Sequence, residues 1–237
     1  MTILHAQFLV HWAGKEFHKP LTAPLDDNLR KEYVDTLIGI LEKGFKMLHR
    51  REEIYDLDGK VLEAFISRVC FTEIKLSLAK EHAGRYGYLG IAVDRDFVLE
   101  RYGNPVFYIN SGKSNVAVNA NKVLEFLQRD PKYKDILAEY RTLLAYFKNM
   151  NDRGCNDLKY YDELEWRVAH LNRLESEGRI AVVDRAKYEY MLKLNPSDVK
   201  VLVFPDDETR KLAFERPGLS ELLDSPICLT INDCENF

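Results

Sequence analysis

The sequence predicts an α+β protein with a mixed or antiparallel sheet, flanking helices and one helical insertion. Short apolar runs with the two-residue period of strands recur along the chain, and amphipathic stretches with a helical period stand between them. Of the 237 residues, 46% are hydrophobic and 30% are charged, which is the balance of an ordinary globular protein. We therefore expect one α+β domain over residues 1–237.

The first elements are a strand, a helix and a second strand. Residues 7–12 alternate as a strand does, and a helix is expected from about Leu29, where Asp27 is the candidate N-cap. Gly44 supplies the helix stop. Residues 45–48 then have the composition of a short strand.

The next segment is polar and then becomes apolar again. Residues 49–64 carry many charges and are interpreted as a surface insertion or a short helix. A strand is expected over 68–74 and a helix over 76–86, with Gly87 as the helix stop.

Two apolar strands, 88–94 and 105–109, flank a short helix at 95–102. Residues 119–149 then carry apolar side chains at helical spacing, and Pro131 marks a break between two helices. We interpret this block as a helical insertion within the domain. It is a candidate partner surface, and helices packed on the sheet are the alternative.

The last third of the chain returns to strands. A strand over 161–168 is followed by strands at 180–183, 200–204 and 227–231, and a helix that ends at Phe214 is capped by Asp206 or Asp207.

Composition excludes several classes of function. The chain has no apolar stretch that resembles a membrane span and no secretory signal at its start, so we expect a cytoplasmic protein without membrane contact. The net charge is −4, and residues 206–237 alone contribute −5, which argues against general nucleic-acid binding. The four cysteines form no Cys-x-x-Cys pair, so no metal site is expected.

The most informative stretch is 161–168. At strand period, Tyr161, Glu163, Glu165 and Arg167 share one face, while Leu164, Trp166 and Val168 can face a core. The first face then presents two carboxylates and a guanidinium side by side on an open surface. A structural Arg–Glu ladder is the alternative interpretation of this pattern.

Two further groups of residues could line a site. His11 and Trp12 end the first strand just before Gly14, where a ligand could approach the backbone. Tyr86 and Tyr88 could form one wall of an aromatic pocket. The chain carries no Gly-x-Ser-x-Gly, Walker-type or reactive-cysteine motif, so the sequence disfavours the hydrolase classes that use these motifs.

Several motifs in a fixed order resemble the AbiGi-type abortive phage-infection family, whose members are commonly labelled antitoxins. The resemblance spans most of the chain and is carried by His11-Trp12, Ile40-Leu41-Glu42-Lys43-Gly44-Phe45, Val69-Cys70-Phe71-Thr72-Glu73-Ile74, His82, Tyr86-Gly87, Gly90-Ile91, Asn104-Pro105-Val106-Phe107-Tyr108 and Tyr161-Asp162-Glu163-Leu164-Glu165-Trp166-Arg167. It implies a bacterial phage-defence role, with a cognate toxin as partner in two-gene versions.

The order of parts is also similar, more weakly, to ADP-ribosyltransferases. That resemblance implies NAD as cofactor, with His11 on a ribose hydroxyl, Phe71 or a nearby Tyr on nicotinamide, and Glu165 at the reacting ribose, while Glu163 orients the acceptor. The cofactor-binding set would comprise His11, Trp12, Phe71, Thr72, Tyr86, Tyr88 and Arg167. The middle strand departs from that family's pattern, because Phe71-Thr72-Glu73 stands where Ser-Thr-Ser or Tyr is expected.

Three hypotheses follow. The first is an NAD-dependent ADP-ribosyltransferase-like defence enzyme with Glu165, Glu163 and His11 as catalytic residues. The second is a non-catalytic antitoxin that binds its toxin through residues 119–149 or the acidic C-terminus. The third is a glycosyl or phosphoester hydrolase that uses the Glu163/Glu165 pair.

Overall fold

The structure is a computed structural model that describes residues 7–17, 24–73, 75–110, 112–150, 160–219 and 226–235. Its strands are β1 (Phe8–Ala13), β2 (Phe45–Tyr55), β3 (Val61–Thr72), β4 (Leu89–Asp94), β5 (Asn104–Pro105), β6 (Phe107–Ile109), β7 (Phe147–Asn149), β8 (Glu165–Ala169), β9 (Ile180–Asp184), β10 (Glu189–Leu192), β11 (Val199–Phe204) and β12 (Ile227–Thr230). Its α-helices are α1 (Asp27–Lys43), α2 (Ala79–Tyr86), α3 (Arg95–Leu99), α4 (Asn115–Gln128), α5 (Lys134–Leu144), α6 (Asn172–Ser176), α7 (Asp207–Phe214) and α9 (Ile231–Cys234). Within these ranges, no helix combines the length and the apolar character needed to span a membrane.

Ten of these strands form one mixed sheet, so the α+β class is confirmed. Along its main path the order is β12-β11-β4-β1-β3-β2-β10-β9, and β8 pairs with the end of β3 and with β5. The β11–β12 pair is parallel, whereas the neighbouring pairs along the path are antiparallel. Strands β6 and β7 form a separate parallel pair.

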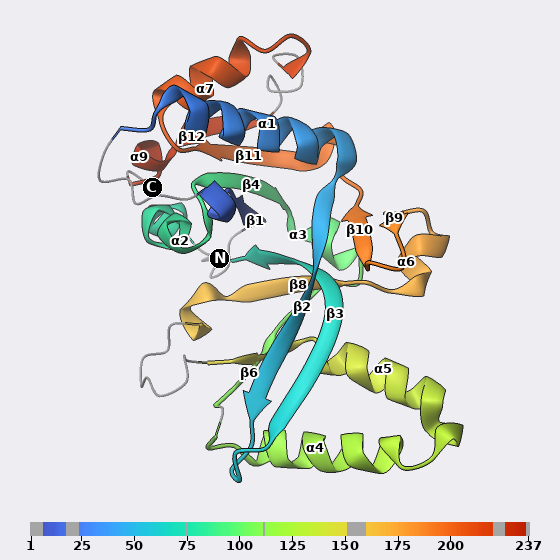
Figure 1. Cartoon of the computed structure of the whole chain (residues 1–237). Helices are drawn as coiled ribbons and strands as arrows, with labels where there is room; N and C mark the ends of the chain where they lie inside the picture. Colours follow the sequence, from blue (N-terminus) through green and yellow to red (C-terminus); the bar gives the residue numbers. More distant parts are fainter. Residues whose placement is uncertain are drawn as a thin grey trace.

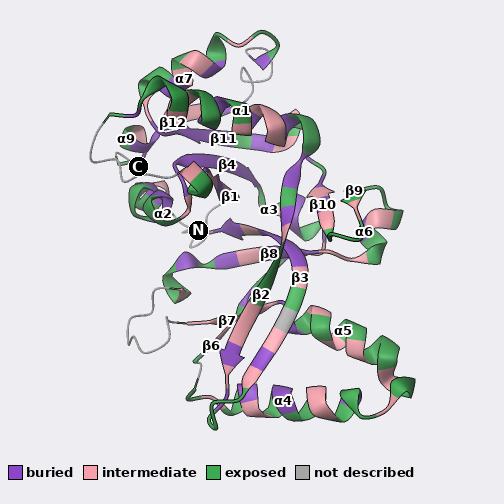
Figure 2. Ribbon diagram, in the orientation of Figure 1, coloured by how far each residue is buried: buried purple, intermediate pink, exposed green. Residues whose placement is uncertain are grey.

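The main core lies where β1, β4 and β11 meet helix α1. Tyr33, Val34 and Leu37 of α1 are buried there, as are Leu89 and the rest of the apolar run of β4. Figure 1 shows α1 and α7 together over β11 and β12, and Figure 2 shows that β11 and the neighbouring strand β4 are mostly buried. A strand enclosed in this way needs an apolar sequence on both faces, which explains the uninterrupted run Leu89-Gly90-Ile91-Ala92-Val93.

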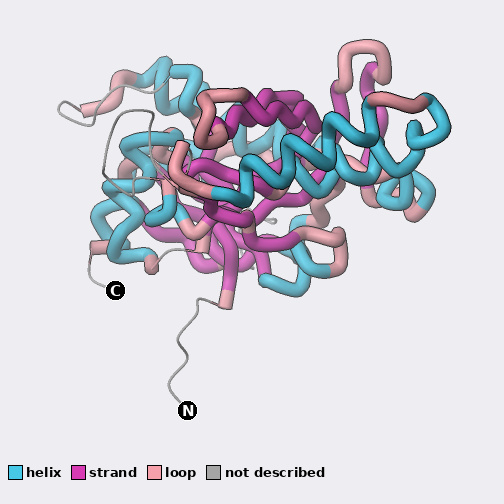
Figure 3. Tube along the Cα trace, turned by 90° about the horizontal axis from the view of Figure 1, so that it is seen from below, coloured by secondary structure: helices cyan, strands magenta, loops and turns pink. Residues whose placement is uncertain are grey.

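The long β2–β3 hairpin extends away from this core as an arm (Figure 1). Helices α4 and α5 pack against the arm and build a second, smaller apolar cluster, which contains Ile54, Leu62, Ile109, Ala117, Ala120 and Leu144. Seen from that end of the molecule, the two helices cross in front of the strands (Figure 3). The arm is thus a two-stranded element that is stabilised by helices from later in the chain.

The prediction for residues 49–64 is wrong, because these residues continue β2 and β3 rather than form an insertion or a helix. Glu53 of β2 lies opposite Glu63 of β3, and Arg51 bridges to both of them, at 2.7 Å to Glu53. A strand pair whose outer face carries ion pairs has few of the apolar residues on which strand prediction depends.

Other boundaries differ by less. Asp26, and not Asp27, caps α1, since its carboxylate accepts a hydrogen bond from Leu29 N at 2.9 Å. Gly44 and Gly87 end their helices as predicted, both at positive φ, and Asp206 caps α7. The helical block begins at Asn115, four residues before position 119, and its last residues form β7. The single-domain description of residues 1–237, with 119–149 as an insertion, stays a prediction.

Candidate functional site

The strand predicted over 161–168 is shorter in the structure. Tyr161–Glu163 form a 3-10 turn, and β8 begins only at Glu165. Leu164 separates the two, with a left-handed backbone at φ 43° and ψ 50°. The prediction that Glu163 shares a strand face with Glu165 is therefore wrong, although both side chains still reach the same place.

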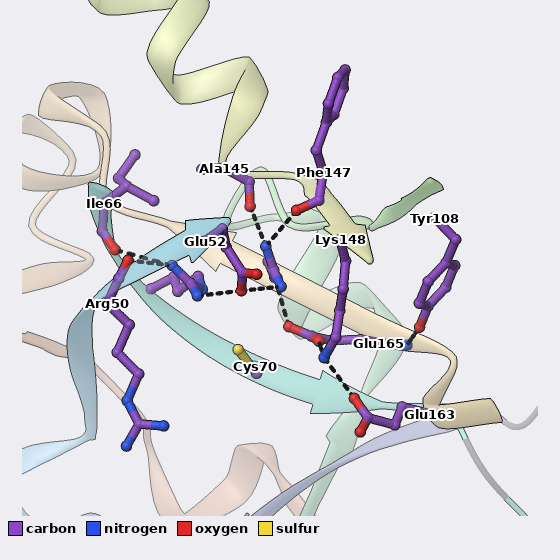
Figure 4. Close-up of polar contacts among 12 residues, drawn as sticks. Arg50, Glu52, Ile66, Cys70, Tyr108, Ala145, Phe147, Lys148, Glu163 and Glu165 are labelled. Atoms are coloured by element: carbon purple, nitrogen blue, oxygen red, sulfur yellow. Dashed lines mark hydrogen bonds and ion pairs between the residues drawn. The ribbon is translucent and has the colours of Figure 1, made fainter. Parts of the chain in front are cut away.

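Both carboxylates are buried rather than displayed on an open face. Glu163 and Glu165 are 2% and 4% exposed, and Arg167 is 1% exposed. Figure 4 shows Lys148, from β7, between the two glutamates. Its Nζ lies 2.6 Å from Glu163 Oε2 and also contacts Glu165 Oε2.

The other oxygen of Glu165 is held by Arg167. Arg167 Nε donates to Glu165 Oε1 at 2.6 Å, and Arg167 also bridges to Glu52 at 2.7 Å. Glu52 in turn accepts from Arg68 at 2.5 Å. The result is a chain of alternating charges, Arg68–Glu52–Arg167–Glu165–Lys148–Glu163, which we call the buried ion chain.

Backbone carbonyls complete the environment of Arg167. Its Nη1 donates to Ala145 O at 2.5 Å and to Phe147 O at 3.3 Å (Figure 4). These carbonyls belong to the end of α5 and to β7, so the ion chain joins the β2–β3 arm, β8 and the segment after the helices. A buried ion pair is tolerated only when such additional hydrogen bonds satisfy its remaining donors.

Sheet register explains why these residues meet. Cys70 lies opposite Arg167 and Thr72 lies opposite Glu165 in the antiparallel β3–β8 pair. Directly paired residues point to the same face of a sheet. Arg68, two residues before Cys70, shares this face as well.

The ion chain fixes the charge of Glu165. Burial alone would raise the pKa of its carboxyl group, but Arg167 and Lys148 together hold that pKa below its ordinary value. Burial would likewise lower the pKa of Lys148, and the two glutamates raise it instead. Glu165 therefore stays ionised over the physiological pH range. A general acid or base needs a pKa near the working pH, and the lowered pKa of Glu165 does not meet that condition.

His11 lies on the opposite face of the sheet from Glu165. Val10 pairs with Thr72 and Thr72 pairs with Glu165, so Val10 shares the face of Glu165 and its neighbour His11 points the other way. His11 packs edge-on against Phe45 and Phe71, and its Nδ1 lies 2.9 Å from Cys70 O. Burial lowers the pKa of His11. The structure thus does not bring the predicted catalytic residues His11 and Glu165 together, and Phe71 lies with His11.

The remaining predicted residues divide between two places. Trp12 lies on the face of Glu165, and its Nε1 donates to Thr72 Oγ1 at 3.2 Å. Tyr86 donates its hydroxyl to Glu163. Tyr88 is buried, and its backbone N–H donates to the hydroxyl of Tyr33 at 3.4 Å.

Three residues of this region are not predicted from the sequence, and a fourth, His82, is named there only among the residues that carry the AbiGi resemblance. Lys148, Glu52 and Arg68 complete the ion chain, and none of them belongs to a recognisable motif. His82 is 6% exposed, and its ring lies 6.0 Å from that of Trp12 and 4.9 Å from that of Tyr86. Its Nε2 is buried without a hydrogen-bond partner in the part of the chain that the structure describes. Burial lowers the pKa of His82 to about 4, with Arg85 and Lys148 acting in the same direction.

Neither a thiolate nor a metal cluster is found among these groups. Burial raises the pKa of Cys70 to about 12, so its thiol, which faces the ion chain, stays protonated. The described residues contain no group of three or more His, Cys, Asp or Glu side chains that could hold a metal ion.

Comparison with known protein families matches residues 40–205 to the family described as "Putative abortive phage resistance protein AbiGi, antitoxin". The chain belongs to the AbiGi family. The matched residues include the whole buried ion chain and helices α4 and α5, whereas His11 and Trp12 lie before the match. No curated protein matches the chain. No solved structure matches it either, so the ADP-ribosyltransferase resemblance stays a prediction.

Proposed function

We propose that this AbiGi protein acts in phage defence as an antitoxin, by binding a partner toxin through the surface of α4 and α5. The observation that carries the proposal is a strip of exposed apolar side chains on these two helices. Val116, Val123 and Phe126 of α4 are 48%, 43% and 54% exposed, and Ile136 and Leu143 of α5 are 53% and 52% exposed. We call these five residues the α4–α5 apolar strip.

Four residues of the strip flank a point of contact between the two helices. At that point, Tyr140 of α5 donates its hydroxyl to Ala120 O of α4 at 2.9 Å. Val116 and Val123 lie one helical turn before and after Ala120. Ile136 and Leu143 stand in the same relation to Tyr140, because residues three and four apart share a helix face.

Such a surface needs an explanation in terms of a partner. Single exposed apolar residues are common on proteins, but several on adjoining faces of two helices indicate an interaction site. An amphipathic helix or apolar face of the toxin could cover the strip, in the manner of helix-in-groove recognition. The family description supplies the partner class, since an antitoxin acts by neutralising a toxin.

The buried ion chain supports a role without catalysis. Both glutamates of the predicted catalytic pair are engaged by Lys148, and Glu165 is also engaged by Arg167. A retaining or inverting hydrolase would need one of these carboxyls to be protonated and both to reach substrate. In place of such a pair, the ion chain ties β8 and β7 to the arm against which α4 and α5 pack.

The test is growth rescue. The chain is co-expressed with the protein encoded by its neighbouring gene in a two-gene arrangement, and we expect the wild type to restore growth. Val123→Glu and Ile136→Glu should each abolish rescue, because each introduces a charge into the apolar strip. Val183→Glu, at a residue of β9 that is 62% exposed, is the matched control and should rescue fully. Equal rescue by all four proteins would refute the proposal.

A further inference from the structure

A second candidate site contains none of the residues of the ion chain or of the α4–α5 apolar strip. It is a cavity of about 610 Å³ between the β2–β3 arm, α4, α5 and the turn between β9 and β10. Its volume falls within the range of small-molecule sites. His49, Phe65, Tyr188, Gln128 and Arg141 are among the residues that line it.

One wall of the cavity is a preformed aromatic stack. The His49 ring lies parallel to that of Tyr188, with centroids 4.3 Å apart and an interplanar angle of 11°. Phe65 stacks on the same imidazole at 6.1 Å and 27°. Phe65 and Tyr188 are nevertheless 53% and 52% exposed. The guanidinium of Arg51 lies 5.9 Å from the Phe65 ring centroid, so Tyr188 is the ring that offers an open face.

Ser67 holds the stack in place through its contacts with His49 and Tyr188. Ser67 is buried and lies 3.2 Å from His49 Nδ1, and its hydroxyl donates to Tyr188 O at 3.0 Å. Tyr188 takes up a left-handed backbone at φ 57°. A residue with a side chain adopts that conformation only when its surroundings favour it. The exposed ring of Tyr188 is therefore oriented by the fold.

The opposite wall carries one uncompensated positive charge. Lys60 pairs with Glu125, and Glu63 pairs with Arg51. Arg141, which is exposed on α5, has no ion pair among the residues that the structure describes. A guanidinium binds phosphate oxygens in a bidentate manner.

We propose that this cavity binds a nucleoside monophosphate, with the base stacked on the open face of Tyr188 and the phosphate bound by Arg141. That aromatic face suits any heteroaromatic base, because such stacking depends little on sequence. The side-chain amide of Gln128 can both donate to and accept from the edge of the base.

The observations favour a free nucleotide over a nucleic-acid strand. A protein that follows a nucleic-acid backbone needs a groove with several cations along it. Here a single unpaired guanidinium stands beside one stack, and the whole chain carries a net charge of −4.

The experiment is calorimetric titration of the full chain with AMP, adenosine and ribose 5-phosphate. We expect saturable binding of AMP and at least about tenfold weaker binding of the other two ligands, since each lacks one of the two recognised groups. Tyr188→Asn keeps a residue that tolerates positive φ and removes the ring. It should weaken AMP binding by at least about fivefold, the lower end of what base stacking contributes.

Arg141→Gln tests recognition of the phosphate separately from stacking of the base. It should reduce the affinity for AMP to that for adenosine and leave adenosine binding unchanged. Arg129→Gln and Phe214→Ala remove an exposed arginine and a partly exposed aromatic ring outside the cavity, and both should bind AMP as the wild type does. The proposal fails if millimolar AMP gives no saturable binding, or if Arg141→Gln binds AMP like the wild type. Much tighter binding of a single-stranded oligonucleotide would overturn the assignment to a free nucleotide.

Discussion

Lys148 is the residue on which the charge balance of the ion chain depends. It is the one cation that contacts both Glu163 and Glu165 in the described structure. Without it, the described residues would leave Glu163 with the hydroxyl of Tyr86, and Glu165 with Arg167 and the thiol of Cys70. Two buried carboxylates would then lie close together with too little positive charge nearby to balance them.

We therefore expect Lys148→Met to lower the free energy of unfolding by about 3–5 kcal/mol, the cost of removing one partner from a buried ion pair. Urea unfolding measures it. Lys122→Met, at an exposed lysine of α4, is the control and should change stability by less than about 0.5 kcal/mol. A Lys148→Met protein as stable as this control would show that the ion chain contributes little.

His82 gives the protein a predicted sensitivity to mild acid. Its pKa falls from an ordinary value of 6.5 to about 4 in the folded protein, so the unfolded chain takes up the proton first. The stability that neutral His82 provides is fully present above pH 6.5 and is lost as the pH falls toward 4. Between pH 7 and pH 5 the loss amounts to about 2 kcal/mol.

His82→Phe keeps an aromatic ring beside Trp12 and Tyr86 but cannot titrate. Its stability should fall by about 2 kcal/mol less than that of the wild type between pH 7 and pH 5. Urea midpoints at both pH values measure this difference. Parallel stability profiles for the two proteins would contradict the burial of a neutral His82.

The sequence anticipates part of this site and omits the rest for identifiable reasons. Glu163, Glu165 and Arg167 stand out because they alternate over a few residues. Lys148 and Glu52 do not, because β7, β2 and β8 meet only through tertiary packing. The face occupied by His11 depends on a single residue of register between β1 and β3, which no local pattern reveals.

At the scale of elements, apolar periodicity locates most strands and helices. The strands of the main core are recognised because Leu89–Val93 and Val201–Phe204 are apolar runs. The arm is missed because its outer face carries ion pairs and its inner face is covered by helices that come later in the chain. The turn at Tyr161–Glu163 is missed because Leu164, a residue that rarely takes up positive φ, ends the apparent strand pattern.

The arm should depend on the second apolar cluster. Leu62 is 2% exposed and packs within this cluster, so Leu62→Ala is expected to lower the free energy of unfolding by about 2–5 kcal/mol. Leu57→Ala, at a leucine that is 52% exposed in the hairpin turn, supplies the comparison and should cost less than about 0.5 kcal/mol. Equal costs would mean that α4 and α5 do not stabilise the arm.

At the scale of the whole molecule, the two interpretations of the glutamate pair make opposite predictions for NAD. An ADP-ribosyltransferase requires His11 and Glu165 at one site, whereas the sheet separates them. We expect purified wild type and Glu165→Gln to give the same background labelling of a cell extract with labelled NAD. Labelling by the wild type that disappears in Glu165→Gln would establish the enzymatic hypothesis instead.

Under the proposed function, the whole fold acts as a scaffold that presents α4 and α5. The main core anchors β2 and β3, the ion chain ties β7 and β8 to that pair, and the helices pack on the arm with their apolar strip exposed. The ion chain, the arm and helices α4 and α5 lie within the residues matched to the AbiGi family, whereas β1 and most of α1, which belong to the main core, lie before the match.

The most direct test is the affinity between the purified chain and its cognate toxin, measured by calorimetry. The account predicts saturable binding for the wild type and for Val183→Glu, and at least about tenfold weaker binding for Val123→Glu, since an unpaired charge would be buried in the interface. Binding of Val123→Glu and Ile136→Glu with wild-type affinity, or no binding of the wild type, would contradict it.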